Sequence, residues 1–307
     1  MTIEELNEAH FNPTISKISM LLSGIFMGNV GIFISLLNEY PIYSIVLFRG
    51  IFGAAFLILF MLITKSFSIA FFKECFKMHW KNLIIIAITN PLVVFLYFWN
   101  ITLTGYAFAA FLLYTSGVFL LIFLVITKEE KVSKINFISF ILAIAGISII
   151  MEFWTGQILI MGIIIGIFSG FCLGIMILSK KKIYNIRKER QSINSLNGNF
   201  DAFLTLWSTL FLFIPFLPLS ITDLFRITIL DFIFILMLGL IPTALAFTLY
   251  NVGVKNDKGG NIIILSYFEP VMATINTAIF FKNLSIFTVI GGFFVLLANY
   301  ITLKYLK

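Results

Sequence analysis

Glu269 is the residue whose position most strongly suggests chemistry, because it lies inside a long apolar stretch. An ionisable side chain inside a membrane costs about 3 kcal/mol, so it usually faces a wet cavity or a partner. Asn276 lies two helical turns away on the same face, and Pro270 removes a backbone donor beside Glu269. This group suits a substrate amine or a proton. The alternative is that the Glu-Pro pair only shapes the helix.

Arg49 is a second charge within an apolar stretch, about a third of the way along it. It could meet an anionic substrate group, form an ion pair that gates access, or extend its long side chain to the membrane surface. Asp201, near the start of a later apolar stretch, is a candidate partner. We favour a structural or gating role for both residues over contact with substrate.

Polar and aromatic residues in two further stretches suggest the walls of a binding site. Asn90 and Tyr97 share one helix face, and Pro91 predicts a break in that helix. Pro242 lies at a similar depth in a later stretch. Broken helices at the interface of repeated units point to binding sites in transporters. The alternative for the aromatic residues is anchoring at the membrane surface.

Small residues recur at helical spacing in two stretches, where they allow helix backbones to approach closely. The glycines of these two stripes are Gly24, Gly28, Gly162, Gly166, Gly170 and Gly174. We expect them to form packing surfaces between the two halves of the chain rather than a dimer contact. Asn29 projects away from the first stripe. It is expected either to line a cavity or to form a buried hydrogen bond with a neighbour.

The elements that position these residues are apolar helices. Hydrophobic residues make up 60% of the 307 residues, and the mean hydropathy is +1.06. A helix needs about 20 mostly apolar residues to cross a bilayer. We therefore expect an all-α, polytopic membrane protein with ten transmembrane helices, at 17–37, 41–63, 82–101, 106–127, 134–152, 157–178, 199–219, 230–251, 259–281 and 285–306.

Motifs typical of several other classes of protein are missing from the sequence. No Gly-rich nucleotide-binding loop is present in the sequence, so ATP is not expected to supply the energy for this protein's activity. His10 and His79 lie in a tail and a loop, so we expect no metal, no cofactor and no catalytic residue. The net charge of +7 is explained by loops that face anionic lipid, and a nucleic-acid partner is not expected.

Lys and Arg are distributed unequally between alternate loops, with 18 of the 21 on one side. Basic loops remain in the cytoplasm, so both termini of this multi-pass protein are expected on the cytoplasmic side of the plasma membrane. The same pattern predicts a cytoplasmic tail at 1–16 and a basic cytoplasmic linker at 179–198. The sequence does not indicate an oligomeric state.

The two halves of the chain repeat each other weakly, because a Gly-Ile-Phe-x-Gly motif in the first span returns in the sixth. We expect one repeat at 17–152 and a second at 153–307. Each holds five spans, an odd number, so the second repeat must enter the membrane from the opposite side. Secondary transporters often use such inverted repeats and bind substrate between them. The inversion places Arg49 and Asp201 near opposite faces, which argues against a direct pair.

Two segments resemble a known family. One contains Leu113-Tyr114-Thr115, Glu130-Lys131-Val132-Ser133 and Ile144-Ala145-Gly146; the other contains Leu265-Ser266-Tyr267-Phe268-Glu269-Pro270-Val271, Gly291-Gly292 and Ala298. They resemble the ends of two EamA domains, and together these resemble a ten-span member of the drug/metabolite transporter superfamily over nearly the whole chain. The family's Pro in the fourth span falls here on Gly117 or Val118. We therefore expect that helix break to be missing or softened.

The resemblance implies a secondary transporter that exports or exchanges small metabolites such as amino acids, or drugs, without ATP, and we expect it to work by alternating access. The resemblance implies a cavity lined mainly by the first, third, fourth, sixth, eighth and ninth spans. Glu269 would be its polar focus, and its neighbours would be Asn90, Tyr97, Asn276 and Asn29. The drive would come from protons or from the solute's own gradient. The alternatives are a membrane-embedded enzyme acting on lipid and a passive channel.

Overall fold

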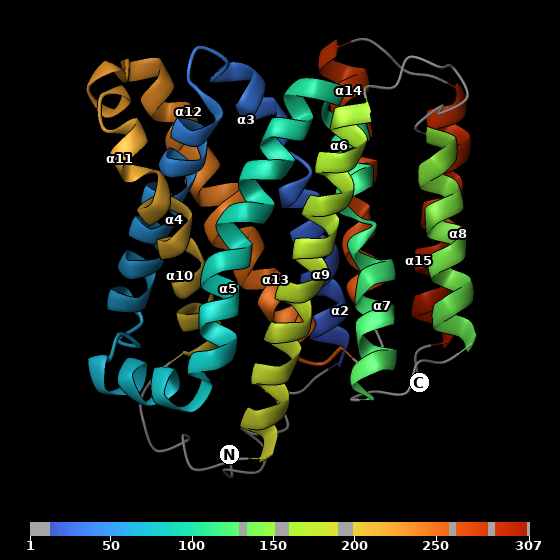
Figure 1. Cartoon of the computed structure of the whole chain (residues 1–307), viewed down its shortest axis with the longest axis horizontal. Helices are drawn as coiled ribbons and strands as arrows, with labels where there is room; N and C mark the ends of the chain where they lie inside the picture. Colours follow the sequence, from blue (N-terminus) through green and yellow to red (C-terminus); the bar gives the residue numbers. More distant parts are fainter. Residues whose placement is uncertain are drawn as a thin grey trace.

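A computed structural model shows the chain as a bundle of helices that run roughly side by side (Figure 1). It describes residues 13–128, 134–150, 160–189, 199–257, 262–281 and 286–305. In this part of the chain, eight helical segments are long and apolar enough to cross a membrane, and two shorter apolar helices accompany them at 137–146 and 289–298. The prediction of an all-α polytopic membrane protein is confirmed.

Several of the ten spans are built from more than one helix. The first repeat contains α2 (Pro13–Met27) with α3 (Val30–Leu36), α4 (Ile42–Ile63), α5 (Ile69–Thr104), α6 (Tyr106–Leu113) with α7 (Ser116–Thr127), and α8 (Lys134–Ile150). The second contains α9 (Ile160–Glu189), α10 (Phe200–Phe213) with η3 (Ile214–Phe216) and α11 (Leu217–Ser220), α12 (Ile229–Gly239) with η5 (Leu240–Leu245) and α13 (Ala246–Val254), η6 (Ile263–Tyr267) with α14 (Phe268–Phe281), and α15 (Ile286–Tyr305). A short turn, η4 (Asp223–Arg226), precedes α12.

Local sequence signals set where several of these helices begin and end. Ser68 and Asn199 cap α5 and α10, because each side chain accepts a hydrogen bond from a backbone N–H in the first turn. Thr228 and Asp231 form a reciprocal capping box at the start of α12. At the other end of α5, Gly105 has φ +86°, a conformation that glycine adopts without steric cost. The chain can therefore turn sharply into α6.

The two repeats run in opposite directions through the bundle. α2 begins at the lower end of the bundle in Figure 1, whereas α9 begins at the upper end, and α15 ends at the lower end. Corresponding helices also make corresponding contacts. α9 packs on α5 and α7 of the first repeat, and α2 packs on α13 and α14 of the second. The predicted arrangement of two inverted five-helix repeats is confirmed.

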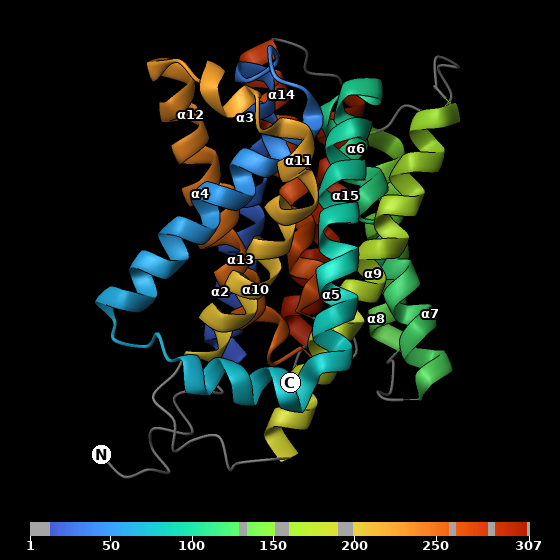
Figure 2. The same ribbon diagram turned by 60° about the vertical axis from the view of Figure 1, so that its left-hand side comes forward.

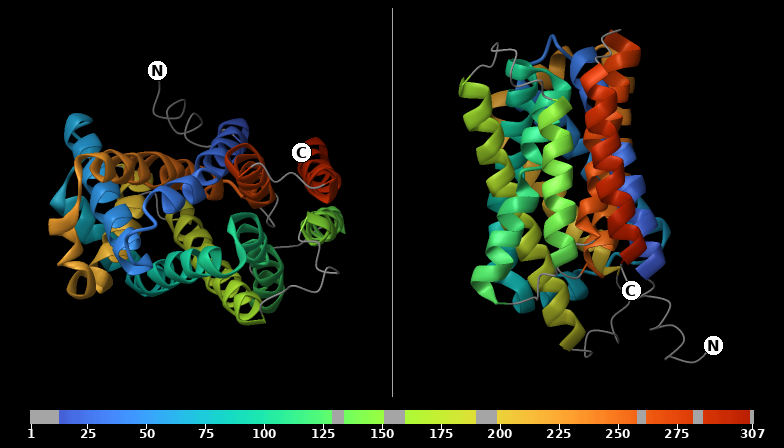
Figure 3. Two further views of the ribbon diagram at one scale, coloured as in Figure 1. Left: turned by 90° about the horizontal axis from the view of Figure 1, so that it is seen from above. Right: turned by 90° about the vertical axis from the view of Figure 1, so that its right-hand side faces the viewer.

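α8 and α15, the last helices of the two repeats, pack against each other at one side of the bundle (Figures 1 and 3). A Cβ added to Gly146 of α8 would lie 2.6 Å from the carbonyl oxygen of Gly291 in α15. The missing side chain on Gly146 therefore lets the two backbones come into direct contact. The other spans are left to enclose the centre of the protein.

α5 extends well beyond the span predicted at 82–101. Its first turns lie across the lower end of the bundle (Figure 2). The helix then continues to Thr104 without interruption at Pro91. The break predicted at Pro91 is therefore absent. Packed neighbouring helices can hold a transmembrane helix together across a proline, and α5 packs along α9 and α10.

α9 also extends further than expected, because it runs to Glu189 and so includes the first part of the predicted linker at 179–198. Lys180 and Lys181 are buried, with only 2% of each residue exposed. They therefore belong to the body of the protein rather than to a solvated loop. Residues 190–198 of the predicted linker and residues 1–12 of the predicted tail lie outside the described part of the chain.

Candidate functional site

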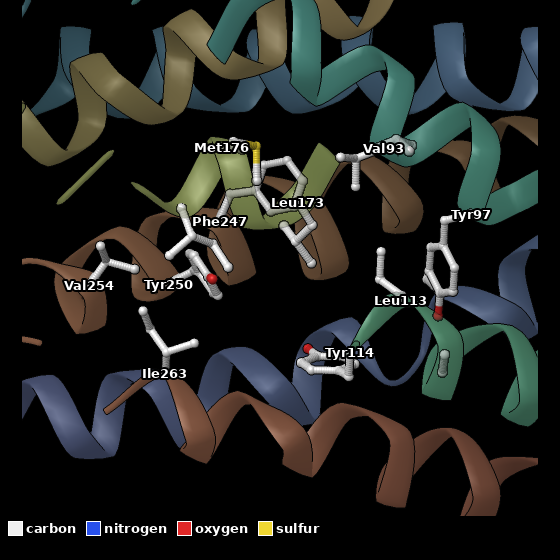
Figure 4. Close-up of a cluster of buried hydrophobic side chains, with 14 of the residues drawn as sticks. Val93, Tyr97, Leu113, Tyr114, Leu173, Met176, Phe247, Tyr250, Val254 and Ile263 are labelled. Atoms are coloured by element: carbon white, nitrogen blue, oxygen red, sulfur yellow. The ribbon is translucent and has the colours of Figure 1, made fainter. Parts of the chain in front are cut away.

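A cavity of about 60 Å³ lies between the two repeats. All six spans that were expected to line it contribute side chains, and the second span adds Arg49. Figure 4 shows part of the apolar wall, including Val93, Leu113, Leu173, Met176 and Phe247. The polar and ionisable side chains of the wall are Arg49, Asn90, Tyr97, Tyr114, Ser116, Lys180, Tyr250, Ser266 and Glu269.

Glu269 is the only acidic side chain among the residues described as lining this cavity. It lies in the first turn of α14 and is 2% exposed. Tyr114 Oη donates a hydrogen bond of 2.6 Å to its Oε2, and Tyr97 Oη donates one of 3.3 Å to its Oε1. Hydrogen bonds to an ionised group are stronger than neutral ones, so the two hydroxyls stabilise a carboxylate at this position. They come from the fourth and third spans, whereas Glu269 comes from the second repeat.

Tyr114 reaches Glu269 because the fourth span is interrupted between α6 and α7, at Tyr114 and Thr115. The break is softened, as expected, because Tyr114 and Thr115 keep right-handed helical backbone angles and the helical span runs from Tyr106 to Thr127. Although the family's proline is absent, Tyr267 Oη donates a hydrogen bond of 2.9 Å to the carbonyl of Tyr114. Gly117 leaves space for that hydroxyl, since a Cβ at Gly117 would lie 1.9 Å from it. The hydroxyl of Tyr267 therefore gives the Tyr114 carbonyl a hydrogen-bond partner, and Gly117 leaves the space that this hydroxyl needs.

Arg49 is 3% exposed, so it does not extend to the membrane surface. Its guanidinium lies 5.4 Å from the ring centroid of Phe98 and 5.0 Å from that of Phe247, both within the range of cation–π attraction. It also donates hydrogen bonds to the hydroxyl of Thr243 and to the carbonyl of Pro242, at 2.8 and 2.7 Å. Arg49 therefore ties the second span to the eighth.

The eighth span needs this partner because Pro242 interrupts its backbone. Proline has no N–H to offer the carbonyl of Leu238, four residues earlier. The hydroxyl of Thr243 donates to that carbonyl instead, at 2.8 Å, and accepts from Arg49. The backbone around Pro242 forms one π-helical turn, η5, and the carbonyl of Pro242 within it also accepts from Arg49. Arg49, Thr243 and Pro242 form one connected unit.

Asp201 lies far from this unit and forms no pair with Arg49. It accepts hydrogen bonds from Tyr184 Oη at 2.8 Å and from Lys255 Nζ at 3.2 Å. Pro270 occupies the third residue of α14, where its missing N–H leaves no interior hydrogen bond unmade. Its carbonyl accepts from the hydroxyl of Thr274, at 2.8 Å. Both residues therefore have structural contacts.

Both ends of the bundle are held by polar contacts between distant parts of the chain. At the lower end, Lys181 forms a buried ion pair of 2.5 Å with Asp257. Asp257 also accepts hydrogen bonds from two backbone N–H groups just before η6 and at its start. At the upper end, Tyr40 donates to Asp231 at 2.8 Å, and Ser44 donates to Asp223 at 2.6 Å. The upper contacts join the first repeat to the second.

The three predicted asparagines have different surroundings. Asn90 lines the cavity, and its Nδ2 donates to the carbonyl of Ser208 at 2.9 Å. Asn276 Nδ2 instead donates to the carbonyl of Gly28 at 2.6 Å and to Asn29 Oδ1 at 3.2 Å. Asn29 and Asn276 are not among the residues that line the cavity. They hold the first span against the ninth, which corresponds to the buried hydrogen bond considered for Asn29.

The glycine stripes lie at contacts between the two repeats. A Cβ at Gly24 would lie 3.2 Å from the backbone nitrogen of Glu269, and one at Gly28 would lie 3.1 Å from its carbonyl oxygen. On α9, a Cβ at Gly170 would lie 3.0 Å from the carbonyl of Leu112. The remaining stripe positions, Gly162, Gly166 and Gly174, face Thr104, Leu112 and Phe119. Each stripe thus approaches the fourth span of the opposite repeat.

Lys180 and Tyr114 are among the cavity residues that were not predicted as site residues. Lys180 belongs to a run of three lysines, which favoured a cytoplasmic loop. A usable signal was nevertheless present, because Leu173, Ile177 and Lys180 follow the spacing of one helix face. Tyr114 appeared only as part of the family resemblance. Among the described residues, no group of three His, Cys, Asp or Glu side chains could hold a metal ion.

Inverted five-helix repeats with a cavity between them are typical of membrane transporters. The model of the EamA-like transporter family matches residues 14–152 and 160–304. The chain therefore belongs to this family of membrane transporters, and each match covers one repeat. A solved structure described as "Crystal structure of protein" shares the fold, with a TM-score of 0.71 at 14% identity over 93% of this chain and 95% of that one. No curated protein matches the chain.

Proposed function

We propose that this protein is a secondary transporter that exports or exchanges small metabolites such as amino acids, or drugs, by alternating access. The observation that carries the proposal is the cavity between the repeats, whose wall contains the buried charges of Arg49, Lys180 and Glu269. Buried charges in a membrane protein usually mark a path for a solute or an ion. No ATP is needed, because movement of the two repeats would expose the cavity to each side in turn.

The size of the cavity supports a closed state. A volume of about 60 Å³ holds about two water molecules at the density of the liquid, so a larger solute needs more room. We infer that the repeats separate at one end to admit it. The contact between Tyr40 and Asp231 joins the two repeats at the upper end of the bundle and is the proposed place of opening there. The glycine stripes would provide the surfaces on which the helices slide.

The proposal is tested by countertransport in proteoliposomes. Purified protein is reconstituted, and vesicles are loaded with one unlabelled solute from a panel of amino acids, nucleosides and cationic drugs. A carrier should take up the matching labelled solute faster when unlabelled solute is inside. Uptake without this stimulation would indicate a passive channel, and no uptake of any panel member would count against transport of these classes.

We propose Glu269 as the residue that couples transport to protons. Glu269→Gln preserves the size of the side chain and one acceptor for the tyrosine hydroxyls, but it cannot release a proton. Uptake driven by an imposed pH gradient should therefore be lost, whereas countertransport should remain. Glu39→Gln, at an exposed position outside the spans, is the matched control. Unchanged pH-driven uptake in Glu269→Gln would reject the coupling role and leave the carrier function intact.

We also propose that the protein lies in the plasma membrane with both termini in the cytoplasm. Basic residues such as Lys73 and Lys77 lie on the first turns of α5, across the end of the bundle where α2 begins and α15 ends (Figure 2). Basic segments of this kind remain on the cytoplasmic side. The rival function, an enzyme acting on lipid, would need a cluster of catalytic side chains at one membrane surface, whereas the charges that line the cavity lie between the repeats.

A further inference from the structure

Lys180 has surroundings that differ from those of the other two charges in the cavity. Glu269 accepts two tyrosine hydroxyls, and Arg49 donates to Thr243 and Pro242. Lys180 is 2% exposed, yet within the described part of the chain no hydrogen bond or ion pair is recorded for its ammonium group. Its contacts are the aromatic rings of Tyr250 and Phe247, whose centroids lie 5.2 and 6.0 Å from Nζ.

Such an environment does not balance a buried charge. Aromatic faces attract a cation, but more weakly than a carboxylate or a set of carbonyl oxygens does. A lysine that only supported the fold would be expected to form an ion pair, as the adjacent Lys181 does with Asp257. The side chain of Lys180 instead lines the cavity. Its missing partner is therefore expected to be something that enters that cavity.

The charges of the whole wall indicate what that partner is. When all three groups are ionised, Arg49 and Lys180 contribute two positive charges and Glu269 one negative charge, which leaves one positive charge in excess. Both cations lie against the same ring, that of Phe247. A ligand with a single negative charge would neutralise the excess. A carboxylate carries that charge, whereas a phosphate monoester carries close to two at neutral pH.

We propose that Lys180 binds the carboxylate of the transported solute, and that this solute is a small organic acid with an apolar or aromatic body. The inference rests on the proposed transport function and narrows its substrate class. The apolar part of the acid would lie against Leu173, Met176 and Val93, which line the same cavity (Figure 4). The rings of Tyr250 and Phe247 hold the ammonium group in place for the carboxylate.

Binding to the purified full-length protein tests this inference. The probes are benzoate, 3-phenylpropionate and 4-methylpentanoate, each compared with its own primary amide, which has the same body and no charge. The readout is the rise of the melting temperature in detergent as a function of probe concentration. In the wild-type protein, at least one acid should stabilise the protein at about tenfold lower concentration than its amide. If each amide stabilises as well as its acid, the inference is wrong.

Variants at position 180 identify the residue responsible. Lys180→Met should remove the preference for the acid, and Lys180→Arg should retain part of it because the charge is kept. Lys182→Met, with the same change two residues away and outside the cavity wall, should behave as the wild type. A preference for the acid that persists in Lys180→Met would overturn the proposal.

The melting temperature without any probe separates binding from a structural role. Replacing an unpaired buried cation with an apolar side chain of similar length should leave the melting temperature of Lys180→Met unchanged or raise it. A lower value would show that Lys180 supports the fold, which contradicts the inference.

The transport assay separates the two proposals. Countertransport of panel solutes together with equal binding of acids and amides would refute the carboxylate site and leave the transporter standing. Binding of acids through Lys180 without any countertransport would support the carboxylate site and count against transport of the panel solutes.

Discussion

Gly117→Ala should destabilise the protein, because Gly117 leaves the space that Tyr267 uses to hold the interrupted fourth span. An added Cβ would lie 1.9 Å from Tyr267 Oη and 2.3 Å from Cε1 of Phe140. Both side chains are fully buried, so neither can move away freely. Overpacking of this kind costs about 1–3 kcal/mol. Displacing the hydroxyl also leaves the carbonyl of Tyr114 without its partner, which costs about 1–3 kcal/mol more.

The assay is thermal unfolding in detergent. A loss of about 2 kcal/mol or more should lower the melting temperature by at least about 4 °C. Gly292→Ala is the matched control, because no atom lies within 4 Å of a Cβ at that glycine in α15. There the higher helix propensity of alanine should leave the melting temperature unchanged or raise it slightly. Equal melting temperatures for the two variants would refute the reasoning.

A double-mutant cycle tests the cause of the loss. Tyr267→Phe removes the hydroxyl that the new methyl group would meet, together with its hydrogen bond to Tyr114. Gly117→Ala and Tyr267→Phe should therefore cost less together than the sum of their separate effects. Strict additivity would show that the clash with the hydroxyl is not the reason.

Two further predictions concern the ends of the bundle. Asp257→Asn breaks the buried ion pair with Lys181 and should lower the free energy of unfolding by about 3–5 kcal/mol. Arg226→Gln removes an exposed side chain from a pair of 3.5 Å with Asp223 and should change that free energy by at most about 0.5 kcal/mol. Equal effects of the two would contradict the importance of burial. In a cysteine-free background, Phe225→Cys should react with a membrane-impermeant maleimide on intact cells and Lys77→Cys should not; the reverse pattern would place the termini outside.

The helical architecture could be predicted from the sequence because a membrane imposes a simple rule. Apolar runs long enough to cross it must become helices, since unpaired backbone groups are not tolerated in lipid. The inverted repeats followed from an odd number of spans per half. Arg49 and Glu269 were found for a related reason, because a charge is conspicuous within an apolar run.

The partners of those residues could not be predicted, because they depend on how the helices are rotated and where they break. The fourth span was expected to have a missing or softened break, but the contacts of Tyr267 and Gly117 at that softened break could not be foreseen. The break predicted at Pro91 was an error, because α5 continues through it. Lys180 was assigned to a loop since hydropathy alone locates the end of a span. Only the packing of α9 shows that its inner face continues past that end.

The unit formed by Arg49, Thr243 and Pro242 has a consequence for how this chain can change by mutation. The hydroxyl of Thr243 both donates to Leu238 and accepts from Arg49. Serine could replace threonine there. Alanine or valine would leave both the carbonyl of Leu238 and a guanidinium nitrogen of Arg49 without a hydrogen-bond partner. Residues 49 and 243 lie in opposite repeats, yet only the change from threonine to serine at 243 keeps the unit intact without a change at 49. Natural variants of this protein should therefore keep a hydroxyl at 243 wherever Arg49 is kept.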